Sequence, residues 1–218
     1  VGRVKKVLDK KALDRGKQDQ NQTGKTVSSP NVELDLVDLI RNGENHKVEF
    51  KSDVLWSAKF SGDDIKNHRP QSKELHEYGK AASKVIIAKS IAGFLNSDGG
   101  TLVVGVRENK DTEIDEIIGV QLEFDKLQDS TQDGYRRMIV DLVKDYLPSY
   151  IFNHLNDYIK IIFQDIGPAK LCAIGIQKSD KRVFLKLNRS EHFYIRTDAS
   201  TRELFGEEIV DYCQNRFA

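Results

Sequence analysis

Apolar residues recur at helical spacing through residues 72–96, the longest such pattern in the chain. The second half of this stretch is apolar on most sides, and a helix without a polar face has to be buried. We therefore predict a central buried helix over residues 73–96. Asn96 is followed by Ser-Asp-Gly-Gly, and paired glycines permit a tight reversal. The apolar run over residues 101–106 that comes next predicts a buried central strand.

Short runs of β-branched and aromatic residues predict most of the remaining structure. The predicted sheet strands cover residues 47–51, 101–106, 158–163, 171–176, 183–187 and 193–196. A further short strand is expected at residues 117–120, and amphipathic patterns predict helices over 135–146 and 207–216, the last with Ile209, Val210 and Tyr212 pointing inward. We predict an α+β fold in which one mixed β-sheet packs against the central buried helix.

Residues 1–30 differ from the rest of the chain, with eight Lys or Arg residues against three Asp residues. Their apolar positions allow one short helix, and residues 18–30 have no core-forming content. We expect a basic leader and linker over residues 1–30 and one domain over residues 31–218. The leader is either a solvated tail, which is the usual role of a charge run, or an arm for nucleic acid or a partner subunit.

The start of the predicted domain alternates between regular and irregular segments. Asn31 is expected to cap a short helix that stops at Asn42 and Gly43. Residues 52–71 then predict an inserted loop. In this loop, Trp56 and Phe60 either pin the loop to the core or stack on bases.

Composition limits the function classes. Lys plus Arg equals Asp plus Glu at 34 each, so nucleic-acid binding would need a local basic patch rather than a whole-molecule field. Two isolated cysteines without a CxxC pair indicate reduced thiols and a cytoplasmic protein. No apolar run approaches the roughly 20 residues that a membrane helix needs, and the five histidines have no zinc-ligand spacing.

Residues 43–51, GENHKVEFK, carry the main candidate chemistry. Successive strand side chains alternate faces, so Glu49 and Lys51 share the face opposite Val48 and Phe50. Glu44 lies on the turn that enters the strand. Two carboxylates and a lysine can hold a divalent cation beside a phosphate, or they can form ordinary surface ion pairs.

Two later blocks join the first: residues 91–109, IAGFLNSDGGTLVVGVREN, and residues 193–210, FYIRTDASTRELFGEEIV. Gly99 and Gly100 either form a plain tight turn, which we favour, or let a phosphate approach backbone amides, although no GxxxxGK[ST] loop exists in the sequence. Ser200 and Thr201 either contact a phosphate backbone or prepare the start of the last helix. In this order the three blocks resemble the Schlafen core domain, also called the AlbA-type or divergent ATP-binding domain, in a prokaryotic-type single-lobe form.

The resemblance implies a site and an activity. In Schlafen members that cut transfer and ribosomal RNA, the catalytic acids match Glu44 and Glu49 here, Lys51 matches the lysine beside them, and Glu108 stands where those members carry Asp. We expect a metal-dependent endoribonuclease that hydrolyses structured RNA, with tRNA as the expected substrate and Mg²⁺ or Mn²⁺ bound by Glu44, Glu49 and Glu108. The alternative is a non-catalytic DNA- or RNA-binding or regulatory module, and a weaker one is a nucleotide-binding protein.

The expected partners are nucleic acid and a second copy of the chain, because mammalian relatives fuse two such lobes into one RNA-gripping body. The residues expected to contact nucleic acid are basic or hydroxylated: Lys47, Lys59, Arg69, Arg107, Arg196, Ser200, Thr201 and Arg202.

Overall fold

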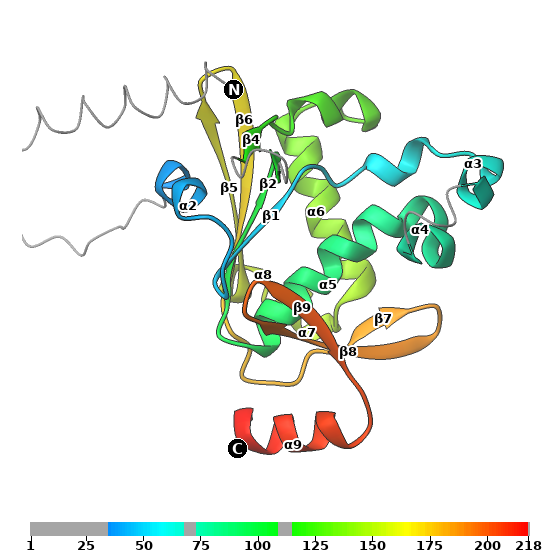
Figure 1. Ribbon diagram of the computed structural model, residues 1–218, viewed down its shortest axis with the longest axis vertical. Helices are drawn as coiled ribbons and strands as arrows, with labels where there is room; N and C mark the ends of the chain where they lie inside the picture. The colour runs from blue at the N-terminus through cyan, green and yellow to red at the C-terminus, as the bar shows by residue number, and fades with distance from the viewer. Residues whose placement is uncertain (1–34, 68–72, 109–114, 218) are drawn as a thin grey trace, which may run out of the picture.

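The computed structural model describes residues 35–67, 73–108 and 115–217, which form a mixed α+β fold (Figure 1). Its main layer is a four-stranded sheet in the order β1-β2-β6-β5. The strands are β1 (Val48–Lys51), β2 (Gly100–Val104), β5 (Ile159–Ile166) and β6 (Ala169–Ile176). β1 runs parallel to β2, whereas β2 pairs with β6, and β6 with β5, in antiparallel fashion. The predicted α+β class is confirmed.

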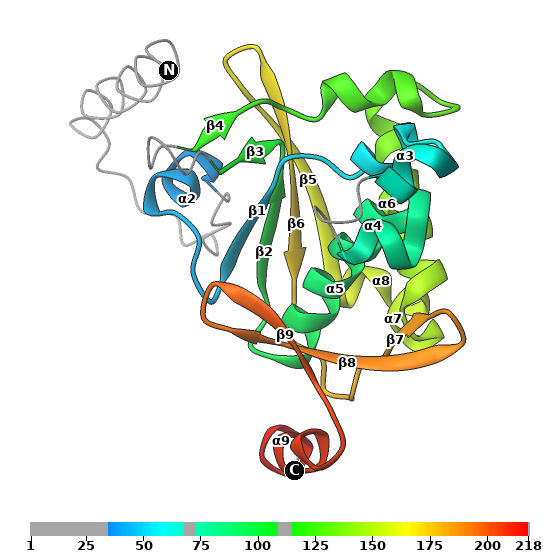
Figure 2. The same ribbon diagram turned by 45° about the vertical axis from the view of Figure 1, so that its right-hand side comes forward.

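One face of this sheet is covered by helices α5 (Ala82–Asn96) and α6 (Gln132–Tyr146), as Figure 2 shows. A parallel strand pair needs a crossover connection, and α5 lies in the connection between β1 and β2. Ile87, Ile91 and Leu95 of α5 are fully buried in the main hydrophobic core. The prediction of a central buried helix is therefore correct for residues 82–96.

The predicted single helix over residues 73–96 is wrong in its first third. The structure has helix α4 (Lys73–Tyr78), then a 3-10 helix (Gly79–Ala81), and only then α5. Gly79 adopts a φ of +54°, a left-handed conformation that favours glycine and that interrupts a continuous α-helix. The chain therefore changes direction before the buried helix begins.

The other face of the sheet is partly covered by helix α2 (Leu36–Asn42). The Asp35 side chain accepts a hydrogen bond from the Val37 N–H at 3.0 Å, which caps the helix. Three residues of α2, namely Leu36, Val37 and Ile40, are buried in a second hydrophobic cluster with Val48 and Phe50. The expected cap Asn31 lies outside the described residues, and the predicted stop at Gly43 is correct, with a φ of +71°.

A separate three-stranded sheet, rather than an extension of the first, forms from the last strands. It contains β7 (Leu185–Leu187), β8 (Ser190–Thr197) and β9 (Ser200–Leu204) in that order. The prediction that residues 183–187 and 193–196 join the main sheet is therefore wrong. This second sheet packs on α5 at Gly93, where an added Cβ would lie 3.1 Å from Cγ2 of Thr201.

The remaining elements are short. They are α3 (Gly62–Asn67), 3-10 helices Trp56–Lys59 and Gln121–Lys126, β3 (Val106–Arg107), β4 (Glu116–Ile117), α7 (Ser149–Asn153), α8 (Leu155–Tyr158) and α9 (Glu207–Arg216). The segment predicted as irregular thus contains two short helices. The final helix has the predicted bounds, but Val210 is 52% exposed and does not point inward. None of the helices in the described residues is long and apolar enough to cross a membrane.

Candidate functional site

The alternation of side chains along β1 places Glu49 between two hydrophobic layers. Val48 and Phe50 are buried in the cluster beneath α2, as the sequence predicts. Glu49 and Lys51 point to the opposite face, toward α5. Glu49 is only 6% exposed, so its carboxylate requires polar partners inside the protein.

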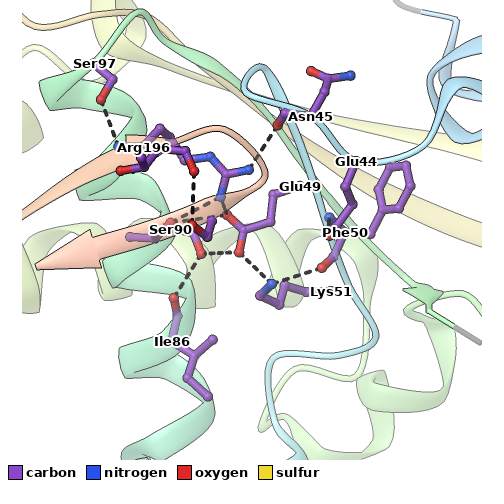
Figure 3. A network of polar contacts seen from close by, with 12 residues as sticks. Glu44, Asn45, Glu49, Phe50, Lys51, Ile86, Ser90, Ser97 and Arg196 are labelled. Carbon is purple, nitrogen blue, oxygen red and sulfur yellow. Dashed lines mark hydrogen bonds and ion pairs between the residues drawn. The ribbon is translucent and has the colours of Figure 1, made fainter. Parts of the chain in front are cut away.

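The Glu49 carboxylate is surrounded by donors from four elements (Figure 3). Oε1 accepts a hydrogen bond from Oγ of Ser90 on α5 at 2.8 Å and pairs with Nζ of Lys51 at 2.5 Å. Oε2 pairs with NH1 of Arg196 on β8 at 2.6 Å and lies 3.5 Å from Oγ1 of Thr201 on β9. This arrangement joins the first strand, the central helix and the second sheet through one side chain.

Arg196 is the main cationic partner of Glu49, and its side chain is only 2% exposed. Its NH2 group donates to the carbonyl oxygen of Asn45 at 3.0 Å, and its guanidinium lies 4.8 Å from the ring centroid of Phe94. The Arg196 backbone N–H donates to Oγ of Ser97 at 2.9 Å. Removing either member of such a buried pair leaves the other charge uncompensated. The pair therefore serves as a structural clamp between the two sheets.

Glu44 lies on the turn before β1, as predicted, and its Oε1 accepts a hydrogen bond from the Phe50 N–H at 2.6 Å. Partial burial of the carboxyl group raises the pKa of Glu44, and the charges of Glu49 and Glu108 raise it further. The Phe50 N–H and the charge of Lys51 act in the opposite direction. Glu49, Glu108 and Lys51 thus lie near enough to influence the ionisation of Glu44.

Glu108 is exposed and directly follows β3, which pairs with β4 in a short ribbon. Gly105, with a φ of +102°, separates this ribbon from β2, so the predicted strand 101–106 ends at Val104. The Gly105 N–H still donates to the carbonyl oxygen of Lys51 at 2.8 Å, which keeps the chain beside β1. Glu108 therefore lies at the end of β3, outside the four-stranded sheet, but near enough for its charge to act on Glu44.

The arrangement of the three sequence blocks agrees with a match to a protein family. The family model for Schlafen, AlbA_2 matches residues 44–205, which include Glu44, Glu49, Arg196 and Thr201. The chain belongs to the Schlafen, AlbA_2 family. Among curated proteins, none is similar enough to this Schlafen chain to count as a match.

Two solved structures resemble this Schlafen domain weakly. The DIP2311 protein of Corynebacterium diphtheriae has 16% sequence identity and a TM-score of 0.45, and the likeness covers 79% of this chain but only 28% of that protein. The N-terminal domain of a putative ATP-dependent DNA helicase RecG-related protein from Nitrosomonas europaea has 15% identity and a TM-score of 0.38, covering 69% of this chain and 94% of that one. This Schlafen chain thus corresponds to about a quarter of the length of the first protein.

The geometry does not fit the three-carboxylate metal site that the Schlafen resemblance implied. Within residues 35–67, 73–108 and 115–217, no group of three or more His, Cys, Asp or Glu side chains is arranged to hold a metal ion. Both oxygens of Glu49 already face protein donors, and one oxygen of Glu44 binds the Phe50 N–H. A cation would have to displace Lys51, whose side chain is 28% exposed, before it could reach Glu49.

Among the described residues, those expected to contact nucleic acid already have partners within the protein. Arg196 and Thr201 are drawn into the Glu49 network, and the buried guanidinium of Arg196 has no exposed side for a phosphate. Arg107 pairs with Glu116 at 3.5 Å, and Arg202 with Glu208 at 3.1 Å. Three others also have partners in the protein: Lys47 donates to the Asp98 carbonyl oxygen, Lys59 lies over the Phe60 ring, and Ser200 donates to the Thr197 carbonyl oxygen. Arg69 lies outside the described residues.

Two sequence interpretations left open can be decided for the Schlafen chain. A Cβ at Gly100 would lie 2.5 Å from the Lys47 carbonyl oxygen, and one at Gly99 would lie 2.5 Å from the Ile176 carbonyl oxygen. Protein backbone therefore occupies the space that a phosphate would need, which supports the plain turn. Ser200 and Thr201 belong to β9 and do not prepare the start of α9, which begins at Glu207.

Ser90 is a member of the Glu49 network that the sequence analysis missed. It is 2% exposed on a helix whose other buried positions are mostly apolar. A buried polar side chain has to find a partner, so a serine within the most apolar part of a predicted central helix was the available signal. Asn96 is a second buried polar residue of this helix, outside the Glu49 network, and its side-chain amide forms hydrogen bonds with the backbone of Val183 and Tyr194.

Proposed function

We propose that this chain is a nucleic-acid-binding domain of Schlafen type that binds its ligand without cutting it. The observation that carries this proposal is that the Glu49 carboxylate is already paired with other side chains of the protein. Its two carboxylate oxygens are held by Ser90, Lys51 and Arg196 at 2.5–2.8 Å. A catalytic metal needs open carboxylate oxygens directed at one point. The described residues provide structural pairing at Glu49 instead.

The proposed ligand follows from the family. The RNA-cutting Schlafen members bind structured RNA, and a related domain that keeps the fold but uses its central acid as a clamp retains a surface for the same kind of ligand. The net charge of zero means that the contact surface has to be a local patch of unpaired basic residues. Binding through such a patch depends on salt and not on a divalent cation.

A combined binding and cleavage experiment tests this proposal. Labelled tRNA and a labelled RNA duplex are titrated with protein by fluorescence anisotropy, once with EDTA and once with Mn²⁺, and the RNA is then examined on a denaturing gel. We expect equal affinity in the two buffers and intact RNA. Absence of binding in both buffers would refute the proposal. Site-specific cleavage in Mn²⁺ alone would show that the domain is a nuclease.

A second candidate function is the metal-dependent endoribonuclease, acting by phosphodiester hydrolysis on structured RNA such as tRNA with Mg²⁺ or Mn²⁺. One observation favours it: the charges of Glu49, Glu108 and Lys51 all act on the ionisation of Glu44. These groups therefore share one neighbourhood even though they are not arranged to hold a metal ion.

The Glu44→Gln variant separates the two functions, because Glu44 makes no contact with the Glu49 carboxylate and glutamine keeps an oxygen for the Phe50 N–H, so the Glu49 clamp should stay in place. A nuclease would lose cleavage in Glu44→Gln while retaining RNA affinity. The control is Glu116→Gln, which removes an exposed acid from β4. Cleavage that is equal in wild type and in both variants would point to a contaminating nuclease.

We also propose that the domain binds structured RNA as a homodimer, because a single lobe covers only part of such a ligand. Equilibrium sedimentation at micromolar concentration, with and without tRNA, is the measurement. Monomers under both conditions would contradict the dimer without affecting the proposed binding function.

A further inference from the structure

A basic segment that the sequence analysis did not single out lies between the two sheets and at one end of the second. We define the basic hairpin as residues 177–190, which contain the whole β6–β7 connection, β7, the turn and the first residue of β8. Its basic residues are all exposed: Lys178, Lys181, Arg182, Lys186 and Arg189. The only acidic residue in this segment is Asp180. In a chain with no net charge, this segment concentrates positive charge.

The charges of the basic hairpin have few internal partners among the residues that the structure describes, and the Nζ of Lys181 lies 5.5 Å from the ring centroid of Tyr150. None of its five basic side chains makes an ion pair there within 4.0 Å, although Lys186 lies opposite Glu191 in the β7–β8 pair. Asp180 uses one carboxylate oxygen to accept a hydrogen bond from the Tyr158 hydroxyl at 2.8 Å. By contrast, Arg107 and Arg202 are both paired with glutamates. The basic hairpin therefore retains charge for an external partner.

The turn at the tip of the hairpin has an unusual residue for its conformation. Asn188 and Arg189 have φ values of +46° and +68°, the pattern of a two-residue hairpin turn in which both central residues are left-handed. Asn suits the first position, but Gly is strongly preferred at the second because a Cβ is strained there. Arg189 therefore weakens the turn and places an exposed guanidinium at its outermost point.

The base of the hairpin is anchored firmly. Val183, Leu185 and Leu187 are buried in the main hydrophobic core, and β8 continues from the tip to Arg196 at the Glu49 clamp. Figures 1 and 2 show the β7–β8 hairpin extending from the body on the side away from β1. At roughly 3.3 Å per strand residue, Arg189 lies about 23 Å along β8 from Arg196. The basic side chains are thus held on the outer face of a hairpin whose inner face packs on the core.

We infer that the basic hairpin is the surface by which this domain contacts the phosphate backbone of a nucleic-acid duplex; this rests on the proposed function. Exposed Lys and Arg side chains without ion-pair partners match the regular phosphates along the outside of a duplex. Phosphate contacts fix position without reading sequence. Binding should therefore be salt-dependent and largely independent of sequence.

The test uses the double variant Lys186→Gln/Arg189→Gly in the full chain. Glycine at position 189 relieves the left-handed strain, so the variant should melt at a higher temperature than Lys186→Gln alone. It should nevertheless bind more weakly to labelled RNA and DNA duplexes of about 20 base pairs. The slope of log affinity against log salt is negative, and each lost phosphate contact reduces its magnitude by about 0.9. We therefore expect the magnitude of the slope to fall by about 2 and the affinity in 0.1 M salt to fall tenfold or more.

The matched control is Lys66→Gln/Lys170→Gln, which removes two positive charges from exposed or partly exposed lysines that already pair with Asp63 and Asp165. Its affinity and salt slope should stay near those of the wild type. If the hairpin variant binds a duplex as tightly as this control does, the inference is wrong and the proposed binding function stands. If the wild type binds no duplex and no tRNA, both fail. Hairpin-dependent binding to phosphatidylserine vesicles without duplex binding would assign the surface to a membrane and overturn the inference.

Discussion

Replacing Glu49 with glutamine tests whether the Glu49–Arg196 clamp holds the two sheets together. The variant keeps the size of the side chain but removes its charge. The single oxygen of glutamine can accept a hydrogen bond from Ser90 or from Arg196 but not from both. The side-chain NH2 group of glutamine then faces the other of these two donors. The guanidinium of Arg196, with its side chain 2% exposed, then has no acidic partner within the described cluster.

The expected cost follows from this burial. Removing one partner of a buried ion pair typically costs about 3–5 kcal/mol because the remaining charge stays desolvated. For a domain of this size, 1 kcal/mol corresponds to roughly 2–4 °C, so the melting temperature should fall by roughly 6–20 °C. Lys51→Gln, which removes the partly exposed partner of Glu49, should cost about 1 kcal/mol or less.

Urea unfolding followed by circular dichroism measures these differences, and a double-mutant cycle with Arg196→Met isolates the pair. Methionine removes the stranded charge, so Glu49→Gln/Arg196→Met should be more stable than the sum of the single variants by about 2 kcal/mol. A Glu49→Gln protein that unfolds within about 1 kcal/mol of the wild type would refute the assignment. So would strict additivity in the cycle.

Three further predictions concern Gly100, Glu123 and Cys172. Gly100→Ala places a methyl group 2.5 Å from both the Lys47 carbonyl oxygen and the Phe94 ring and should lower stability by about 1–3 kcal/mol, whereas Gly62→Ala, with nothing within 4 Å, should change it by less than about 0.5 kcal/mol; thermal melts compare them. Burial raises the pKa of Glu123 above its ordinary value of 4.5, so the folded state holds the proton more tightly than the unfolded state does. The wild type should therefore lose stability relative to Glu123→Gln as the pH rises from 4.5 through the raised pKa, and a constant difference across urea titrations would contradict this. Burial also raises the pKa of the Cys172 thiol, so iodoacetamide at pH 8 should leave Cys172 unmodified in the native protein and label it only in urea, as mass spectrometry would show.

The features that the sequence predicts correctly are those with a local cause. Val48 and Phe50 alternate with Glu49 and Lys51, and strand geometry alone places them on opposite faces. The buried part of the central helix follows from its lack of a polar face. The break at Gly79 could not be inferred, because an isolated glycine is tolerated within a helical pattern and only the backbone conformation shows that it ends one.

Features that depend on distant partners could not be predicted from local patterns. Strand periodicity identifies β8 but not the strand that pairs with it. The pattern alone therefore does not show that β7 and β8 form a sheet separate from the main one. Ser200 and Thr201 suit both a helix start and a strand, and only pairing with β8 decides between them. Arg196 was assigned to phosphate because the 147 residues that separate it from Glu49 leave no local sign of their contact.

The same separation affects how the chain is made. Glu49 leaves the ribosome long before Arg196, and at about 5–20 residues per second the delay is roughly 7–30 s. During that interval β1 and α5 are available, but the charge at their centre lacks its arginine partner. The first sheet therefore lacks this contact until β8 emerges. A chain that stops after β6 contains all four strands of the main sheet. It should nevertheless be less stable around Glu49 than the full chain and more susceptible to proteolysis.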